Sequence, residues 1–356
     1  MNPISILITG GAGFVGSNLA LKLKSAFPHS TVYAFDNLKR RGSELNIKRL
    51  QEAGVEFIHG DIRNASDFNE IGPIDLLIEA AAEPSVLSGI QGTPDYVLQT
   101  NLIGTLNCLH FAHKHKAAFL FLSTSRIYPI DPLSQIPIIT EDKRFNIDPN
   151  AQILGISPKG INEQFTLEGA RSFYGASKLS SELIIQEYAA FYQMPTIINR
   201  CGVITGPWQM GKIDQGVVVL WMAKHYWKKE LSYIGYQGSG KQVRDMLHID
   251  DLYDLILHQI QNFTLYQSQI CNVGGGLDVS ASLLEMTEIC AEITGNQIKM
   301  NHILENRAAD IPIYISDNSK IQEIGAWQPK NSVKSLFFDI FKWIRENENL
   351  LKPLLS

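Results

Sequence analysis

The sequence contains few cysteines, and none lies at a spacing typical of a metal or redox site. The four residues are Cys108, Cys201, Cys271 and Cys290. Because no metal-ligand or C-x-x-C pattern is present, we expect reduced and buried thiols. The formal net charge of −5 is small for 356 residues. It gives no indication of nucleic acid or an anionic membrane surface as a partner.

The chain also lacks long hydrophobic runs. No apolar stretch approaches the ~20 residues that a membrane span needs. The first residues, MNPISILITGG, enter an apolar segment directly, without a basic region or a cleavage site, so we predict a cytoplasmic protein. With 45% hydrophobic and 19% charged residues, the composition is typical of a globular enzyme with a sizeable core.

Three histidines lie together in HFAHKHK: His110, His113 and His115. A metal site would need further ligands, and this segment contains no acidic residue or cysteine. We favour the end of an exposed helix, where positive charge suits the helix dipole. We therefore expect no bound metal.

The first thirty residues read as a strand, a glycine turn and a helix. Residues 4–8 are a short apolar run, and Gly10, Gly13 and Gly16 follow at G-x-x-G-x-x-G spacing. Residues 19–27 then repeat apolar side chains at helical spacing. The glycines permit a tight turn, approach of a pyrophosphate to the backbone, and close packing of helix on strand. The helix N-terminus offers N–H groups to phosphates.

A second predicted strand, TVYAFD, ends in Asp36, 20 residues after Gly16. A carboxylate at this place typically binds the adenosine ribose hydroxyls, and it repels the 2′-phosphate of NADP. The cations at positions 39–41 act in the opposite sense, because they attract that phosphate. The alternative for Asp36 is a helix or turn cap. We predict ribose binding and a preference for NAD.

Further strands and helices alternate along the next hundred residues. Residues 55–64, 73–86 and 117–125 contain apolar runs that predict strands, and residues 95–115 predict a long helix. Buried strands that alternate with helices indicate an α/β fold, a Rossmann-type doubly wound parallel sheet with helices on both faces. Ligands bind such sheets beyond the carboxyl ends of the strands.

Residues 174–178, YGASK, place a tyrosine and a lysine four positions apart at the start of a segment with helical spacing. Such residues share a helix face, although most such pairs are solvated. Thr124 ends the strand predicted over 117–125. Together with TGGAGFVGSNL, TNLIGTLN, LSTSRIY, GPW and CNVGGG, this set resembles the extended short-chain dehydrogenase/reductase family of nucleotide-sugar epimerases and dehydratases. The resemblance covers nearly the whole chain.

The chemistry of that family explains the residue types. A phenol with its ordinary pKa of ~10 is a poor base at neutral pH, and a nearby ammonium favours the phenolate. The resemblance implies that Tyr174 is the general base and acid. It implies that Lys178 supplies the positive charge and reaches the nicotinamide ribose, and that Thr124 holds the substrate oxygen by a hydrogen bond.

The resemblance also implies NAD as cofactor and a homo-oligomer, a dimer or a tetramer. The implied cofactor-binding residues come after the predicted strands or lie on the helices. They are Gly10, Gly13, Phe14, Val15, Gly16, Asp36, Asn37, Asp61, Ile62, Ala80, Ala81, Asn101, Tyr174 and Lys178.

The two residues after Thr124 bear on the reaction. Sugar 4,6-dehydratases of this family commonly carry Asp and Glu there, and the related decarboxylases carry an acid at the second place. Here the residues are Ser125 and Arg126. The chain therefore looks limited to hydride transfer at one carbon. Arg126 either contacts an anionic group or is a solvated side chain.

Within the family, DNLKRRGSELN, HGDIRN, DQGVV and GSGKQVRDMLHIDDL resemble the CDP-paratose 2-epimerases. That resemblance implies a CDP-sugar substrate bound by Ser125, Arg126, Gln215 and Arg244. A bidentate guanidinium suits the diphosphate. The alternative for Arg244 is an ion pair with Asp245 or Asp250.

The sequence departs from the family at three places, and one of them is Ser125-Arg126, which replaces the Asn-Lys that these epimerases tend to show. Glu79 stands where many members have His, and residues 154–172 replace the usual segment before the catalytic tyrosine. The exact sugar is therefore open. Alternatives to a 2-epimerase are a UDP-sugar 4-epimerase, an NAD(P)-dependent nucleotide-sugar reductase, and a non-catalytic NAD-binding regulator.

We predict two domains, an NAD-binding Rossmann domain over 1–199 and a mainly nucleotide-sugar-binding domain over 200–356, with some chain returning to the first. Residues 217–229 predict a helix, and residues 231–247 predict two short strands around a glycine turn. Three aromatic side chains of this part either stack on a base or belong to the core or rim. They are Trp208, Tyr233 and Tyr236.

Overall fold

The structure is a computed structural model that describes residues 2–90, 92–211 and 215–356. Packing divides the chain into two units. The first comprises Met1–Ile127, Ser172–Arg200 and Tyr253–Cys271, and the second comprises Tyr128–Arg171, Cys201–Leu252 and Asn272–Ser356. The predicted boundary at 199/200 differs in one respect, because residues 128–171 group with the second unit. The binding roles assigned to the two parts remain predictions.

The main sheet of the first unit confirms the predicted fold class. Its seven strands follow the order β14-β10-β5-β4-β1-β2-β3, and β1 pairs in parallel with both β2 and β4. The chain order reverses beside β1, so this is the doubly wound arrangement. The strands are β1 (Ser5–Thr9), β2 (Thr31–Asp36), β3 (Glu56–His59), β4 (Leu76–Glu79), β5 (Ala118–Thr124), β10 (Thr196–Cys201) and β14 (Gln269–Val273).

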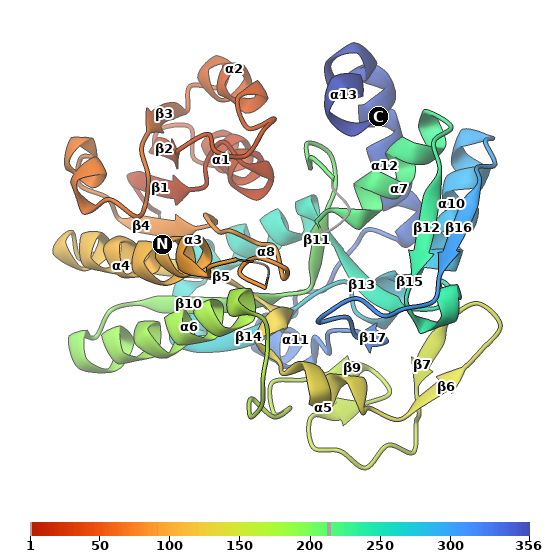
Figure 1. The fold of residues 1–356 in the computed structure, drawn as a ribbon. Helices are drawn as coiled ribbons and strands as arrows, with labels where there is room; N and C mark the ends of the chain where they lie inside the picture. Colours follow the sequence, from red (N-terminus) through yellow and green to blue (C-terminus); the bar gives the residue numbers. More distant parts are fainter. Residues whose placement is uncertain (1, 91, 212–214) are drawn as a thin grey trace. The chain divides into compact units, whose positions relative to one another are not determined.

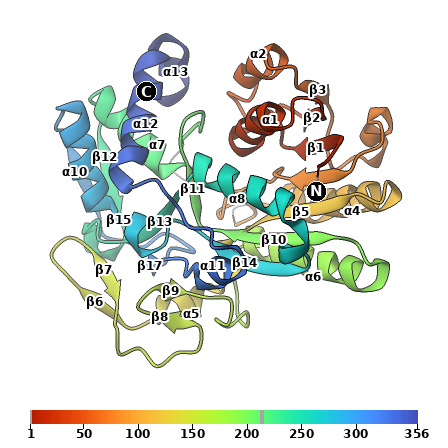
Figure 2. The same cartoon turned by 180° about the vertical axis from the view of Figure 1, so that it is seen from behind.

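Helices cover both faces of this sheet (Figures 1 and 2). On one face lie α4 (Gly104–Lys114) and α6 (Phe173–Tyr192), and on the other lie α1 (Phe14–Ala26) and α8 (Ile249–Gln261). Every residue of β1, β5 and β10 is buried. That burial explains why these strands read as continuous apolar runs rather than alternating ones. The remaining helices are α2 (Leu45–Glu52), α3 (Asp95–Leu98) and α9 (Phe263–Tyr266).

The long helix predicted over 95–115 is interrupted. It consists of α3, a π-helical turn over Gln99–Ile103, and α4. A π turn inserts an extra residue into the helical ladder and is common at functional sites. Here it contains the buried residues Thr100 and Asn101.

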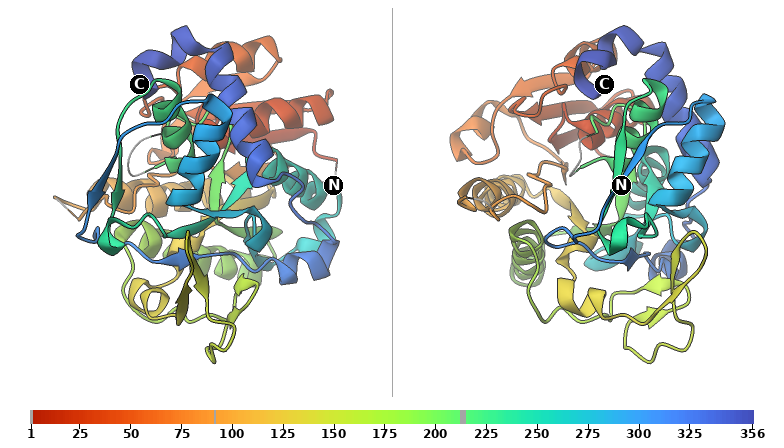
Figure 3. Two further views of the ribbon diagram at one scale, coloured as in Figure 1. Left: turned by 90° about the vertical axis from the view of Figure 1, so that its right-hand side faces the viewer. Right: turned by 45° about the vertical axis from the view of Figure 1, so that its right-hand side comes forward.

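The second unit is built from small sheets and amphipathic helices. A four-stranded sheet contains β11 (Val203–Thr205), β13 (Val243–His248), β15 (Ser280–Ser282) and β17 (Ile313–Tyr314), and β12 (Leu231–Ile234) pairs with β16 (Met300–Ile303). The helices α7 (Val217–Tyr226), α10 (Leu283–Thr294) and α12 (Val333–Glu346) pack on one another (Figure 3). Smaller elements are β6 (Ile138–Thr140), β7 (Phe145–Ile147), β8 (Ile156–Ser157), β9 (Gly160–Ile161), α5 (Ile130–Ser134), α11 (Ser319–Gly325) and α13 (Glu348–Leu355).

Several predictions about side chains can be compared with this fold. The four cysteines are free and buried, as expected. His110 and His113 are exposed at the end of α4, and no group of potential metal ligands occurs among the described residues. Within the described ranges, every helix is too short or too polar to cross a bilayer. The two strands predicted over 231–247 exist, but they pair with other strands rather than with each other.

Candidate active site

The glycine loop after β1 packs so closely at Gly10 and Gly16 that a side chain at either position would collide with neighbouring backbone. Gly10 has a φ of +64°, which favours glycine. A Cβ at Gly16 would lie 2.1 Å from the carbonyl oxygen of Gly10, so α1 packs here only through a glycine. A Cβ at Gly13 would meet only Gly10 within 4 Å, which leaves this position open to a ligand. Gly11, which the motif did not single out, packs against Ala34.

The N-terminus of α1 offers backbone donors beside that opening. Its N-cap is Gly13, no side chain caps it, and its first turn contains no acidic residue. Phe14 and Val15 occupy the first two helical positions and are half-buried. Free N–H groups and the positive end of the helix dipole together bind anions. The loop and helix therefore fit a dinucleotide pyrophosphate.

Asp36, at the carboxyl end of β2, is anchored by backbone donors. Its Oδ2 accepts a hydrogen bond of 3.1 Å from the N–H of Ala12, and its Oδ1 accepts one of 2.7 Å from Leu38. Burial raises the pKa of this carboxyl, and the N–H donors oppose that rise. The carboxylate thus caps the glycine loop. Asp36 therefore caps a turn, which was the alternative considered for it. Binding of the adenosine ribose stays a prediction.

A polar cluster surrounds Asp61, beyond β3. Arg63 donates to its Oδ2 at 2.6 Å, and Asn37 donates to the same oxygen at 2.9 Å. Burial disfavours ionisation of Asp61, but these hydrogen bonds outweigh it and lower its pKa to about 2. Lys39 and Arg63 both lie over the ring of Tyr96, at 3.5 and 4.9 Å from its centroid. The neighbouring Ile62, also predicted to contact the cofactor, is buried.

The loop after β4 lies against the glycine loop. A Cβ on Gly10 would come within 2.9 Å of Ala80 and Ala81, so the two loops touch. Asn101, in the π turn, accepts from the N–H of Glu83 at 2.8 Å and donates to its carbonyl at 3.1 Å. The amide also donates to Ser177 Oγ at 3.2 Å. Asn101 therefore ties this loop to α6.

The predicted catalytic hydroxyl lies at the carboxyl end of β5. Thr124 is 7% exposed, and its Oγ1 accepts a hydrogen bond of 3.2 Å from the N–H of Arg126. That bond shapes the short 3-10 turn Ser125–Ile127. Ser125 is buried, whereas Arg126 is half-exposed.

The helix α6 carries the predicted acid–base pair next to this strand end. Ser172 is its N-cap and accepts from the N–H of Gly175, so the helix starts just before Tyr174. Tyr174 is 9% exposed and Lys178 only 1%. The Lys178 ammonium lies over the ring of Phe121 in β5, 3.7 Å from its centroid. The first unit thus brings Tyr174, Lys178 and the strand bearing Thr124 into one packed region.

A buried ion pair that sequence reasoning missed supports the same helix. Glu182, one turn after Lys178, accepts from Arg200 Nη2 at 2.8 Å and from Ser123 Oγ at 2.5 Å. Glu182 is 0% exposed and Arg200 5%. The pair fastens α6 to the ends of β5 and β10. The sequence signal for this pair was a glutamate in a helical segment and an arginine in an apolar segment. The two residues are 18 positions apart, so their pairing could not be read from a short stretch.

Two predicted substrate-binding residues belong to the second unit. Arg244, in β13, donates to Asp310 Oδ1 at 3.1 Å and to the carbonyl of Ile311 at 2.7 Å. Arg244 therefore forms an ion pair, as the alternative prediction had it, but the partner is Asp310 and not Asp245 or Asp250. Gln215 is half-exposed before α7, and Asp214 of the DQGVV stretch lies outside the described residues.

The three aromatic residues considered for base stacking have definite surroundings in this unit. Tyr233 is 3% exposed, and its hydroxyl donates to Thr287. Trp208 packs on Trp343, and Tyr236 meets Phe145 edge-on. Tyr233 is thus a core residue.

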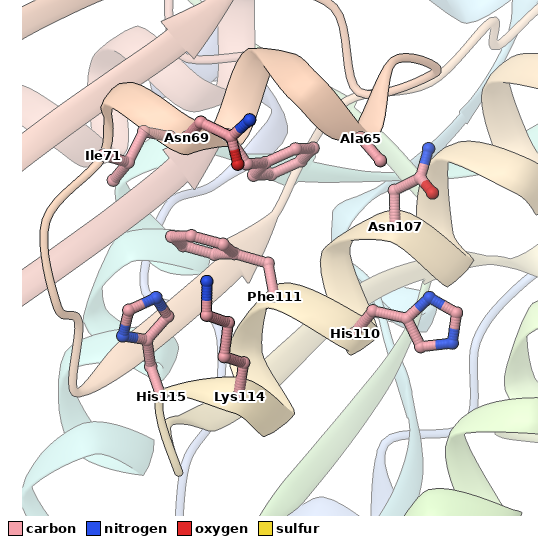
Figure 4. A pocket seen from close by; sticks show the side chains of 9 residues that line it. Ala65, Asn69, Ile71, Asn107, His110, Phe111, Lys114 and His115 are labelled. Carbon is pink, nitrogen blue, oxygen red and sulfur yellow. The ribbon is translucent and has the colours of Figure 1, made fainter.

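A separate cavity of about 240 Å³ opens in the first unit between residues 65–71 and α4 (Figure 4). Asn107, His110, Lys114 and His115 lie along one side of it. Burial, together with the nearby Lys114, lowers the pKa of His115. None of the predicted catalytic or cofactor residues lines this cavity, so it is distinct from the candidate site.

Comparisons with known proteins identify the family of the chain. The NAD dependent epimerase/dehydratase family model matches residues 6–274. The chain is 29% identical to a CDP-paratose 2-epimerase from Salmonella typhi, over 96% of this chain and 99% of that protein. It is 26% identical to a putative UDP-glucose 4-epimerase from Methanocaldococcus jannaschii, over 96% of this chain and 99% of that one.

A solved structure agrees with the whole fold. A double mutant of a dTDP-glucose 4,6-dehydratase from Streptomyces venezuelae, solved with NAD bound, superposes with a TM-score of 0.78. It is 26% identical and aligns over 98% of this chain and 99% of that chain. The names of these three proteins specify different reactions.

Proposed function

Because the chain belongs to the NAD-dependent epimerase/dehydratase family and uses NAD, we propose that it is an epimerase that inverts one hydroxyl-bearing carbon of a nucleotide-linked sugar. Our specific assignment is C2 of a CDP-3,6-dideoxyhexose, as in a CDP-paratose 2-epimerase. The observation that carries the proposal is the region formed by α6 and the end of β5, where Tyr174, Lys178 and Thr124 are all present and buried.

The chain's own residues perform the acid–base part of this reaction. Bound NAD supplies the acceptor, and afterwards the donor, of the hydride. Thr124 holds the sugar oxygen by a hydrogen bond while Tyr174 takes its proton and later returns it. Lys178 favours the phenolate because its positive charge is buried on the same face of α6. Burial from water strengthens that electrostatic effect.

The remaining assignments concern binding. In the proposal the glycine loop and the first turn of α1 hold the pyrophosphate, Asp36 the adenosine ribose, and Asp61 with Ile62 the adenine. Ser125, Arg126, Gln215 and Arg244 contact the nucleotide sugar. Arg244 would then exchange its single contact with Asp310 for the diphosphate, which offers a guanidinium a bidentate partner.

The choice of epimerisation rests on the two residues directly after Thr124. Ser125 and Arg126 provide no carboxyl group for removal of water, so the site is equipped for hydride and proton transfer alone. The CDP preference draws on the 29% identity to the Salmonella typhi epimerase and on the GKQVRD stretch. A 4-epimerase is the second candidate, because the pose of the sugar decides which carbon is oxidised and one relative is named as a UDP-glucose 4-epimerase.

The test is to incubate the protein with CDP-paratose, and separately with UDP-glucose, without an external reductant. The sugar protons are followed by NMR. Inversion at C2 of CDP-paratose supports the proposal, and inversion at C4 of UDP-glucose supports the second candidate. Loss of water, or a strict need for added NADPH, would overturn both epimerase assignments. The Tyr174→Phe protein is the matched control for inversion that does not depend on this site.

A further inference from the structure

The buried carboxyl of Glu79 lies among the residues beneath α6. Glu79 is the last residue of β4 and is 0% exposed. It pairs in register with Thr9 of β1 and with Phe121 of β5. Side chains paired in this way on neighbouring strands point to the same face of a sheet. The Lys178 ammonium lies over the Phe121 ring, so Lys178 and Glu79 share that face.

The surroundings of Glu79 contain one strong charge. Helix α4 contributes Thr105 and Cys108, helix α6 contributes Lys178, and the paired strand residues are a threonine and a phenylalanine. Glu79 and Lys178 each act electrostatically on the Cys108 thiol, whose pKa is raised mainly by burial. Lys178 is therefore the cation whose field Glu79 experiences.

Hydrogen-bond counting indicates which form Glu79 adopts. Thr105 Oγ1 lies 2.6 Å from Glu79 Oε1 and 2.8 Å from the carbonyl oxygen of Asn101. A hydroxyl has a single proton to donate. If that proton goes to the Asn101 carbonyl, Glu79 must carry a proton and donate it to Thr105. The second oxygen, Oε2, is buried with no hydrogen-bond partner, which would strongly disfavour a carboxylate.

We propose that Glu79 is a positioning residue, a titratable counter-charge to Lys178 that determines the pH range in which Tyr174 releases and accepts its proton. This inference rests on the proposed function only in that Tyr174 is the acid–base group. Glu79 touches neither substrate nor cofactor in this scheme. It acts through Lys178.

The direction of the effect follows from the charges. Burial raises the pKa of Glu79 to about 7, against the opposing effect of Lys178. Below that pH Glu79 is neutral, and the whole charge of Lys178 favours the Tyr174 phenolate. Above it Glu79 becomes negative and offsets part of that charge, which raises the pKa of Tyr174. The two groups therefore titrate in a linked way.

The first test measures the titration of Tyr174 directly, without substrate. Tyrosinate absorbance is recorded against pH for the wild type and for Glu79→Gln, each relative to the same protein with Tyr174→Phe. We expect the Glu79→Gln phenolate to form at a lower pH, by on the order of one pH unit, because Lys178 is then never offset. An unchanged titration would overturn the proposal. This readout is independent of whether the protein is an epimerase.

The second test uses the pH dependence of turnover with the nucleotide sugar. The basic shoulder of kcat should move to lower pH in Glu79→Gln and return toward wild type in Glu79→Asp, which restores a titratable group. Cys108→Ala, a substitution in the same cluster without a carboxyl, should keep the wild-type profile. A shift shared by Cys108→Ala would mean a packing effect and would count against the proposal.

If Glu79→Gln does not fold, an infrared measurement on the wild-type protein still tests the proposal. The infrared band of a neutral, buried carboxyl group should be present near pH 6.5 and be lost as the pH rises beyond about 8. Absence of that band would show that Glu79 is already ionised and would overturn the proposal. If the titrations move as expected but no nucleotide sugar is inverted, the proposed function fails and the role of Glu79 stands.

Discussion

The first unit buries charged side chains beneath α6, whereas the second unit buries aromatic and aliphatic side chains between α7, α10 and α12. Under α6 the exposed fractions of Lys178, Glu182 and Arg200 are 1%, 0% and 5%. The core of the second unit contains Trp221 and Phe337 among other apolar residues. Both regions are interiors of one chain, and among the residues that the structure describes the buried Glu182–Arg200 pair lies in the first of them.

This difference indicates that the region beneath α6 serves function at a cost in stability. Burying charge is costly, and a buried ion pair is often no better for stability than well-packed apolar residues. An enzyme tolerates this cost where perturbed pKa values are useful. Between α7, α10 and α12 the second unit shows the alternative, an interior made mainly of packed apolar side chains.

Glu79 in the first unit and Asp245 in the second are fully buried acids with raised pKa values, and their surroundings differ. Burial raises the pKa of Glu79 to about 7 and that of Asp245 to about 6. Asp245 Oδ2 accepts from the N–H groups of Gly276 and Ser316, whereas Glu79 Oε1 contacts the Thr105 hydroxyl; the other oxygen of each acid is buried without a hydrogen-bond partner. The backbone donors stabilise the ionised form of Asp245.

The largest effect should come from removing the Tyr174 hydroxyl. We expect Tyr174→Phe to lower kcat by 10²- to 10⁴-fold, the range typical of a lost general acid or base, with NAD still bound. Steady-state kinetics and the NAD content of the purified protein measure this. The matched variant in the second unit is Tyr226→Phe, which loses a hydrogen bond of 3.0 Å to Glu348 and should keep its turnover. Full activity in Tyr174→Phe would mean that the base is another residue.

The next effect concerns the buried ion pair. Arg200→Met leaves the Glu182 carboxylate buried without its cation, so the free energy of unfolding should fall by about 3–5 kcal/mol. Phe337→Ala, in the apolar core, should lose a similar amount by leaving a cavity. The double variant Glu182→Leu with Arg200→Met should recover much of the loss, because no unpaired charge remains. Urea unfolding measures all three, and a double variant no more stable than Arg200→Met would refute this account.

The third effect is a dependence of stability on pH. Glu79 keeps its proton in the folded state up to about pH 7, whereas an ordinary Glu loses it near 4.5. Its contribution is therefore fully present below pH 4.5 and is lost as the pH rises to about 7, by about 3 kcal/mol. Glu79→Gln should flatten the unfolding free energy over that window. A slope that stays unchanged in Glu79→Gln would assign the dependence to other groups, of which Asp245 is the first to examine.

A smaller effect is expected on cofactor choice. Apo protein should bind NAD more tightly than NADP, by about tenfold or more, because the Asp36 carboxylate repels a 2′-phosphate. Asp36→Asn should reduce that ratio. Titration with each dinucleotide, followed by tryptophan fluorescence, measures both. Tighter binding of NADP to the wild type would show that the cations at positions 39–41 dominate.

The smallest effect should result from disruption of a surface ion pair in the second unit. Lys334 lies 3.1 Å from Glu292, and their side chains are 72% and 66% exposed. Lys334→Ala should change the free energy of unfolding by no more than ~1 kcal/mol, because water and salt screen such pairs. A loss as large as that of Arg200→Met would contradict the distinction drawn between buried and exposed charge.

The sequence by itself determined most of the first unit. Its central strands β1, β4 and β5 are buried on both faces, so they appear as local apolar runs. The glycine loop determines a local backbone turn, and YGASK determines one face of a helix. Both features depend on residues only a few positions apart. Fold class and the Tyr174–Lys178 pair can therefore be read from short stretches of sequence.

Only the tertiary structure decided the rest, because the deciding contacts join residues far apart in sequence. Strand β13 pairs with β15 and β17 rather than with β12, and Arg244 meets Asp310 rather than either neighbouring acid. The partner of Glu182 in helix α6 is Arg200, 18 residues away in strand β10. The titration of Glu79 depends on the burial that four surrounding elements create, and local residue patterns do not encode burial of that kind.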